Sequence, residues 1–348
     1  MKKFVLGFGL ALLAVGCSNE VLVEEQQNPQ EEVQTPISFA TFADKQVRSQ
    51  SVLMEDYHNT IAVYGVKENV TVQTVFNNVT LNYTPGGTPN DWAYSPLRYW
   101  DKQATYEFIA FAPASAPMAY VLHTDGKVTG GHFQTSAPYT LVGQNLQNGT
   151  SNEEIYTGFT GEAGKDADIM LAPMVPANGT TKGIVNFDFY HILSKLNVAV
   201  KLNASLGSSV VKVKNITISG LKKTGTYTDA DGWSATVKDP NYKLQFNNAD
   251  GVAVNATKAL YFLESLVMPQ AMAGTLNMEY TISTGTISTG GYEETYYYEQ
   301  PLEDIFTATT FDKGSNYTIT FTISPSVITF DAKVSNWATG ENAGVNIN

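Results

Sequence analysis

Cys17 is the residue whose type and position most directly predict a chemical reaction. It is the only cysteine of the chain and follows the small-residue run Leu13-Ala14-Val15-Gly16. Lys2, Lys3 and the uncharged stretch Phe4–Gly16 have the positive start and apolar core of a secretory signal, and the stretch is shorter than the about 20 apolar residues that span a bilayer. We therefore predict a lipoprotein signal peptide at residues 1–17, with Cys17 acylated by a palmitate-type chain. The alternative is an ordinary signal peptide with an incidental cysteine.

The segment behind Cys17 looks like an arm that can be cut away. Residues 18–34 are rich in Glu, Gln and Asn, a composition typical of a disordered spacer. A short segment of β character, residues 35–42, follows and leads into a polar linker that holds Arg48. Arg48 is one of two arginines in 348 residues. The body of the protein begins after it.

The histidines do not form a metal site in sequence. They are His58, His123, His132 and His191, and their spacing matches no metal-ligand motif. For His123 and His132, near Asp125 in a Gly-rich stretch, a solvated loop is favoured over a metal site. His191 lies between two apolar runs and is expected to be a hydrogen-bonded structural residue. With no hydrolase motif either, we predict no metal, no cofactor and no enzymatic activity.

Acidic and aromatic clusters have equally plain interpretations. The stretch 229–232 (Asp-Ala-Asp-Gly) begins like a calcium loop, but Pro240 stands where the closing Glu belongs, so a turn is favoured. Adjacent carboxylates at 293–294 and 303–304 point to opposite faces of a strand, which does not give the paired acids of a glycosidase. The tyrosines at 296–298 offer either a sugar-stacking platform or aromatic rows on the two faces of one strand, and the second is favoured.

Composition excludes several partners. Charged residues are only 16% of the chain while hydrophobic residues are 43%, and the net charge is −12. Binding to nucleic acid or to anionic lipid needs clustered Lys and Arg, so neither is expected. A single cysteine cannot form an intramolecular disulfide, so stability must come from apolar cores.

From Thr60 onward the chain reads as many short strands. Strands are expected at 61–66 and 317–323, a strongly apolar strand at 105–112, and one with clean alternation of apolar and polar residues at 196–202; no 12-residue amphipathic helix is evident. Strands are also expected at 70–75 and 79–83. We predict a linker or long turn at 174–183, hairpin turns at 229–232 and 247–251, and surface loops over 114–165. This pattern favours β-sandwiches.

Several segments, taken together, resemble the fimbrillin-like lipoproteins of Bacteroidia-type bacteria, which build type V pili. The order and spacing of these segments over nearly the full length carry the resemblance. They are the run before Cys17, Ile37-Ser38-Phe39 followed by Arg48, Trp100–Pro113, Asp168–Ala172, Phe187-x-Phe189-x-His191-x-x-Ser194-Lys195-Leu196, Leu266–Gln270, Gly314-x-x-Tyr317-Thr318-Ile319 and Val334-x-x-Trp337.

The resemblance implies an all-β fold with two transthyretin-like β-sandwich domains in tandem. In this scheme residues 1–17 are the signal peptide, 18–48 are a propeptide arm with a removable strand, 49–183 are the N-terminal sandwich and 184–348 are the C-terminal sandwich. The precursor is an outer-membrane lipoprotein that an arginine-specific protease cuts between Arg48 and Ser49. The mature form then lies on the cell surface in fimbriae.

The resemblance also implies a structural pilin, a fimbrial shaft or accessory subunit that supports adhesion. The strand at 35–42 leaves, with Ile37, Phe39 and Thr41 as its key residues, and a strand of another fimbrillin subunit replaces it by β-strand addition. Repetition gives a head-to-tail filament. The donor strand is expected within 327–348, with Val327, Phe330, Val334, Val345 and Ile347 as candidate residues.

Two alternatives stay open. The first is a lipid-retained anchor subunit that keeps its acylated Cys17. The second is a surface glycan-binding lipoprotein that uses residues 114–165 and the tyrosines at 296–298. The expected partners are the same or other fimbrillin subunits, the protease, the outer membrane through the lipid, and a host or bacterial surface ligand.

Overall fold

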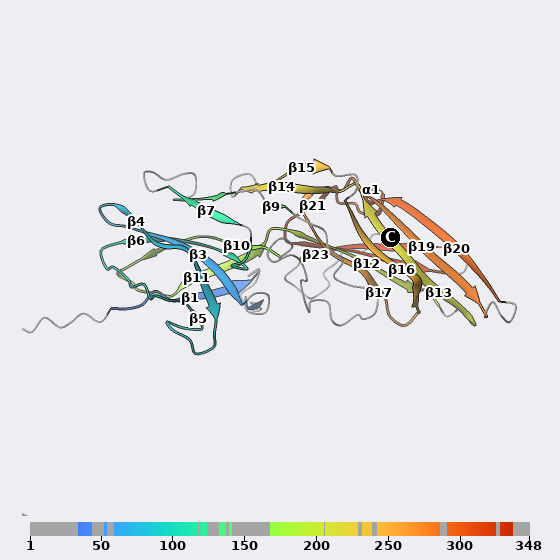
Figure 1. The fold of residues 1–348 in the computed structure, drawn as a ribbon, viewed down its shortest axis with the longest axis horizontal. Helices are drawn as coiled ribbons and strands as arrows, with labels where there is room; N and C mark the ends of the chain where they lie inside the picture. The colour runs from blue at the N-terminus through green and yellow to red at the C-terminus, as the bar shows by residue number, and fades with distance from the viewer. Residues whose placement is uncertain are drawn as a thin grey trace, which may run out of the picture. The chain divides into compact units, whose positions relative to one another are not determined.

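The computed structural model describes residues 34–43, 52–53, 59–116, 118–123, 132–136, 139–140, 168–204, 206–228, 232–238, 242–285, 291–324 and 328–336. Contacts divide the chain after Gln34, and every described strand belongs to the part from Thr35 onward. Over the described residues the one helix is the short α1 (Leu302–Ile305), and no helix there is long and apolar enough to cross a membrane. The prediction of an all-β fold is confirmed (Figure 1).

The first large element is an eight-stranded sheet that includes the first described strand of the chain and a strand near residue 190. Its spatial order is β2 (Val52–Leu53), β1 (Phe39–Ala43), β11 (Val185–His191), β10 (Met170–Asn178), β6 (Thr105–Ala112), β3 (Thr60–Glu68), β4 (Val72–Tyr83) and β5 (Trp92–Ala93). Most neighbours are antiparallel, but β1 runs parallel to β11. The first strand of the described residues, β1, is therefore an inner strand of this sheet.

Both faces of the eight-stranded sheet are packed. On β3, Ile61 and Val63 belong to one core and Ala62 and Tyr64 to another, as the period of two requires. The first core also contains the buried residues of β1 and β11. The second is covered by β7 (Ala119–Leu122), β8 (Phe133–Ser136) and residues of the C-terminal half such as Leu266. Such a doubly covered sheet can carry the near-continuous apolar runs seen in the sequence.

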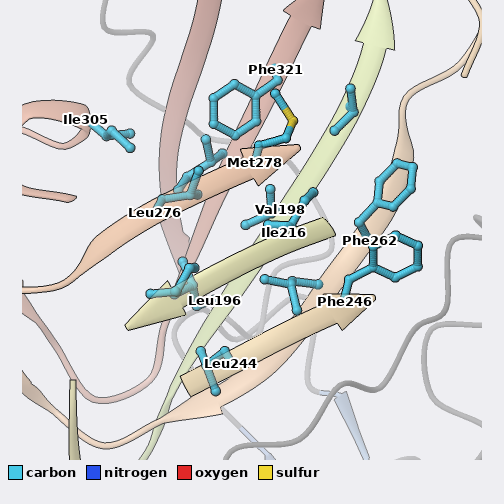
Figure 2. Packing of buried hydrophobic residues seen from close by; sticks show 14 of the residues in the cluster. Leu196, Val198, Ile216, Leu244, Phe246, Phe262, Leu276, Met278, Ile305 and Phe321 are labelled. Carbon is cyan, nitrogen blue, oxygen red and sulfur yellow. The ribbon is translucent and has the colours of Figure 1, made fainter. Parts of the chain in front are cut away.

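The C-terminal half forms a β-sandwich of two four-stranded sheets. One has the order β17 (Leu260–Val267), β12 (Ser194–Leu202), β22 (Ser315–Ile323), β23 (Ile328–Asn336), and the other β16 (Lys243–Val254), β13 (Ser209–Ser219), β19 (Thr275–Thr284), β20 (Tyr292–Pro301). Figure 2 shows their inward side chains interdigitating, with Val198, Ile216, Phe262 and Met278 among them. The predicted sandwich architecture is confirmed here.

Two further small sheets complete the described part. They are β9 (Tyr139–Thr140) on the hairpin of β14 (Lys222–Thr228) and β15 (Gly232–Lys238), and the pair β18 (Gln270–Ala271) with β21 (Thr310–Phe311). Strands β14 and β15 are antiparallel neighbours with Thr228 opposite Gly232, on the two sides of the turn predicted at 229–232. Residues 229–231 themselves lie outside the described residues.

The predicted hairpin turn at 247–251 is wrong. These residues lie inside β16, which runs from Lys243 to Val254. Opposite them the pairing with β13 shifts, since Asn247 faces Asn215 whereas Val252 faces Val213. Gly251 has φ +68°, where a side chain would be strained. The polar stretch therefore makes an irregularity within one strand, and its turn-like composition serves that bulge.

Two strand boundaries also differ from prediction. Residues 174–178 continue β10 instead of beginning a linker, because they pair with β6 beyond a register shift at Ala172. The two strands expected at 70–75 and 79–83 are one strand, β4, with Asn78 at φ 51°.

Strand β11 pairs with β1 and β10, so the change of sheet falls between His191 and Ser194. The division into domains at 183/184 stays a prediction, and the sheet order places the first strand after that boundary with the N-terminal half.

Candidate functional site

Strand β1 lies between β2 and β11 in the eight-stranded sheet, and we call this position its seat. It runs parallel to β11, from Phe39 opposite Val185 to Ala43 opposite Phe189, and meets β2 over two residue pairs on its other side. Its burial alternates along the strand, with Phe39, Thr41 and Ala43 inward. Ile37, just before it, is also fully buried. The segment thus supplies an inward stripe of a core that the rest of the sheet surrounds.

The deepest part of the seat is an aromatic pocket around Phe39. Its ring lies 5.3 Å from Phe76 and 5.7 Å from Phe108 edge-on, and stacks at 5.7 Å on Phe187. Gly65 on β3 makes room for this arrangement, because a Cβ there would stand 2.6 Å from the Phe108 ring. Full burial of a Phe side chain stabilises by roughly 1.5–3 kcal/mol. Phe39 therefore anchors the strand.

Residues on both sides of β5 hold the main chain of β1 and of Ile37 just before it. The Asn90 Nδ2 donates to the carbonyl of Phe39 at 2.6 Å, and the Tyr94 hydroxyl donates to the carbonyl of Ile37 at 2.8 Å. The Ile37 N–H donates to the carbonyl of Arg98 at 2.9 Å. Because these bonds engage backbone atoms, they recognise a strand irrespective of its side chains.

Burial keeps the Tyr94 hydroxyl a donor. It raises the pKa of Tyr94 to about 12, with hydrogen bonding and the charge of Arg98 acting in the opposite direction. The hydroxyl is therefore protonated throughout the physiological pH range. Its bond to the strand is available throughout that range.

The fit of β1 is incomplete at one position. The hydroxyl of Thr41 is buried and has no hydrogen-bond partner among the described residues. A buried unsatisfied polar group costs about 1–3 kcal/mol. The parallel ladder with β11 is also slightly weaker per residue than an antiparallel one. Strand β1 is held firmly by its anchor, yet another strand could fit the seat better.

The residues predicted to be processed lie outside the described residues. This applies to Cys17, Arg48 and Ser49, so acylation and cleavage stay predictions. In sequence, Arg48 falls between β1 and β2, which are antiparallel neighbours. The three strand residues named from sequence, Ile37, Phe39 and Thr41, are all buried in the seat.

The candidate donor residues separate into two groups. Phe330 and Val334 lie in β23, whose backbone pairs with β22 along its whole length, and Val334 packs against the core of its own sandwich. Val327, Val345 and Ile347 lie outside the described residues. Since β23 completes its own sheet, a donor function for this end of the chain is more easily assigned to residues beyond Asn336.

The titratable clusters are structural. His132 is buried and pairs with Glu107 at 2.7 Å, so the solvated loop expected at this residue is wrong. The buried His191 pairs with Asp168, which confirms that His191 is a hydrogen-bonded structural residue. Over the described residues, no group of His, Cys, Asp or Glu could hold a metal ion. His58 and Asp125 lie outside them.

A buried ion pair joins two strands of the C-terminal sandwich. Lys195 on β12 pairs with Glu264 on β17, and both side chains are nearly inaccessible. Burial lowers the pKa of Lys195 and raises that of Glu264, while their mutual attraction opposes both shifts. Their place fits a structural function in this sheet.

Sequence reasoning did not find Asn90 and Tyr94. They sit in a loop-like stretch with Pro and Gly, and their partners on β1 are 51 and 57 residues away in the chain. A side chain that bonds a distant main chain leaves no local pattern. A buried tyrosine next to a turn was the only available signal.

Comparison with known proteins gives a consistent picture. The profile of one family, described as fimbrillin-like, matches residues 50–337. A Bacteroides uniformis protein named as a fimbrium subunit, Fim1C, is 26% identical over 181 residues, which is 52% of this chain and 54% of that protein. The chain thus spans about half the length of this relative.

The fold also occurs in a solved structure. The crystal structure of a fimbrial protein from Bacteroides vulgatus superposes with a TM-score of 0.57 at 16% identity, covering 87% of this chain and 99% of that one. At this identity the likeness concerns the fold alone.

Proposed function

The chain belongs to the fimbrillin-like family, and from this premise we propose that it is a structural subunit of a surface fimbrium that assembles by exchange of strand β1. The precursor is exported as a lipoprotein acylated at Cys17 and is cut between Arg48 and Ser49. A strand of another fimbrillin subunit then occupies the seat of β1. The protein acts in adhesion as part of the filament and not as an enzyme.

The seat of β1 is the observation that carries this proposal. The family profile begins at residue 50, so β1 stands outside the matched segment although it fills the core inside it. A strand that precedes the matched segment yet completes its core is what a temporary strand requires. An empty seat would expose an apolar slot and an unpaired sheet edge, which is an aggregation hazard during export.

Cleavage at Arg48 changes what holds β1. The peptide link to β2 is lost, and the strand is then held by its ladder with β11, the Phe39 pocket and the bonds from Asn90 and Tyr94. A second strand in the same position could make the same ladder, fill the same pocket and accept the same hydrogen bonds. An incoming strand with an apolar residue in place of Thr41 avoids the unsatisfied hydroxyl, which favours replacement.

The donor strand is assigned to residues after Asn336. Strand β23 already pairs with β22 in its own sheet, so its use as a donor would break that sandwich. Val345 and Ile347 have the alternation that a strand entering the seat needs. One subunit thus offers a seat at one end of its sequence and a strand at the other, which gives head-to-tail growth.

Arg48→Ala tests the proposal. The purified precursor is digested with an arginine-specific protease and analysed by N-terminal sequencing and by denaturing gels without boiling. The natural chain should give a new N-terminus at Ser49 and ladders of multimers. The Arg48→Ala variant should stay uncut at this position and monomeric.

Lys45→Ala is the matched control, since it removes a neighbouring cation and leaves the arginine. It should behave as the natural chain does. Normal polymerisation of Arg48→Ala would contradict the proposal. A mature surface form that keeps an acylated Cys17 would instead identify a lipid-held anchor subunit.

A further inference from the structure

The outer face of the sheet β16-β13-β19-β20 carries a hollow that strand exchange does not use. It has a volume of about 320 Å³ and lies over β13, β19 and the edge strand β20. Strand β20 contains the three consecutive tyrosines singled out in the sequence. The structure separates them by face, and only one of them opens onto this hollow with most of its side chain exposed.

Tyr296 and Tyr298 belong to the sandwich. Both pack against its core, Tyr296 stacks on Tyr280 at 5.2 Å, and Tyr298 meets Phe321 edge-on at 5.3 Å. Tyr297 between them faces outward and is 77% exposed. The favoured interpretation of aromatic rows on two faces is therefore right for the trio. It leaves the exposure of Tyr297 unexplained, because an aromatic ring that stays in water does not contribute to stability through burial.

Polar side chains from neighbouring strands surround Tyr297 in two rows. Pairing between strands aligns one row as Asn215, Glu279 and Tyr297. The next row consists of Thr217, Asn277 and Glu299. All six lie on the face opposite the core, since their sequence neighbours Ile216, Met278 and Tyr298 point inward. The arrangement is an aromatic ring beside amides, a hydroxyl and carboxylates.

The hydrogen-bonding groups of this surface match an alcohol. The Thr217 hydroxyl donates to the Asn215 Oδ1 at 2.8 Å, so the Asn215 NH₂ group can donate elsewhere. The carboxylates of Glu279 and Glu299 accept from hydroxyl groups, and the Asn277 amide does both. The face of Tyr297 is negative and suits the weakly positive C–H groups of a sugar ring.

The charge of the hollow selects against anionic ligands. Of the described residues that line it, two are glutamates and none is Lys or Arg. The nearest ion pair on this sheet joins Lys214 to Glu293 at 3.1 Å, which neutralises that lysine. A sialylated, sulfated or uronic saccharide would meet like charge and lose solvation without a partner.

We propose that this hollow binds a neutral saccharide, with one sugar ring stacked on Tyr297 and its hydroxyls bonded to Asn215, Asn277 and the two glutamates. The volume is at the lower end for ligand pockets, which suits one or two sugar units and not a long glycan. The site lies away from the seat of β1 and needs no strand exchange. It would give the subunit an adhesive surface of its own.

The test measures binding of the full chain to a panel of neutral oligosaccharides built from glucose, galactose, mannose and N-acetylglucosamine, and to sialylated counterparts. Calorimetry on the best ligand then compares variants. Tyr297→Ala should lower the affinity at least about tenfold, which is about 1.4 kcal/mol. Asn277→Ala should also weaken binding, and sialylation of the ligand should abolish it.

Tyr292→Ala is the matched control, because Tyr292 is an exposed tyrosine at the start of the same strand and does not line the hollow. It should leave the affinity within about twofold, because it removes no side chain that lines the hollow. Thermal unfolding checks that each variant folds. Binding to none of the neutral glycans, a preference for sialylated ones, or equal affinity of Tyr297→Ala would each overturn the proposal.

Discussion

Two residues on β1 act against each other. Phe39 is fully buried among aromatic rings and stabilises the strand in its seat, whereas Thr41, two residues on and facing the same core, buries a hydroxyl that has no partner in the part of the chain that the structure describes. A permanent core strand would gain from an apolar residue at the second position. A temporary strand needs to be held well enough for export and yet be replaceable, and these two residues fit that requirement.

Phe39→Ala should weaken the retention of β1, because it removes the ring that fills the aromatic pocket. Truncation of a buried Phe costs about 3–5 kcal/mol because the cavity is filled only in part. After cleavage by an arginine-specific protease, the fragment containing β1 should leave faster than from the natural chain. Size-exclusion chromatography with mass spectrometry measures this release. Phe42→Ala, which alters an outward-facing and only partly buried ring of the same strand, should release far more slowly; equal release from both variants would mean that the pocket does not anchor β1.

Thr41→Val should have the opposite effect. Valine has nearly the same shape and removes the buried hydroxyl, so the seated strand gains about 1 kcal/mol. The cut precursor should then hold β1 longer and form multimers more slowly than the natural chain under the same conditions. Faster multimer formation by Thr41→Val would show that its hydroxyl does not limit the fit.

At the scale of elements, alternation in the sequence predicted most strands, because one buried face imposes a period of two. It did not predict which strands are neighbours. The parallel pairing of β1 with β11 joins residues about 146 apart in sequence, such as Phe39 and Val185, and no local pattern encodes that distance. Turn-like composition also misled at 247–251, since a bulge and a turn both use Gly with positive φ.

For the seat of β1, the sequence likewise predicted the strand but not the residues that contact it. Phe39 stands in a recognisable strand before an arginine, so its importance could be inferred from sequence. The pocket that receives it comes from β4, β6 and β11, and the side chains that hold the main chain, Asn90 and Tyr94, lie on the two sides of β5. Those contacts exist only once the sheet order is known.

The pair Lys195–Glu264 gives a prediction about the strands β12 and β17. Glu264→Ala leaves a buried ammonium without this carboxylate and should lower the free energy of unfolding by about 3–5 kcal/mol. The double variant Lys195→Met with Glu264→Leu should lose much less, because both charges are removed together. Urea unfolding followed by fluorescence measures the differences.

Glu293→Ala is the comparison for this pair. It breaks the contact with Lys214, whose side chain and that of Glu293 are 24% and 36% exposed. Water solvates and screens such a pair, so the loss should be below about 1 kcal/mol. Similar losses for Glu264→Ala and Glu293→Ala would contradict the buried character of the first pair.

At the scale of the whole molecule, we expect that the seat can bind a β1 strand supplied as a separate peptide. A synthetic peptide of residues 35–43, added in excess to the cut protein, competes with the donor strand for the same seat by mass action. It should shorten the multimer ladder in proportion to its concentration. A peptide with Phe39→Ala should compete poorly, and one with Phe42→Ala nearly as well as the natural peptide. Ladders insensitive to all three peptides would place the subunit contact elsewhere.

The parallel run of β1 beside β11 has a mechanical consequence. A pull along the axis of β1 loads all the ladder bonds with β11 together in shear, so these bonds share the load instead of breaking one by one. In a precursor tethered at Cys17, cleavage at Arg48 alone would therefore not release the body from the membrane. In the proposed scheme the body would stay attached through β1 until an incoming strand replaces it, so cleavage and release from the membrane would be two separate events.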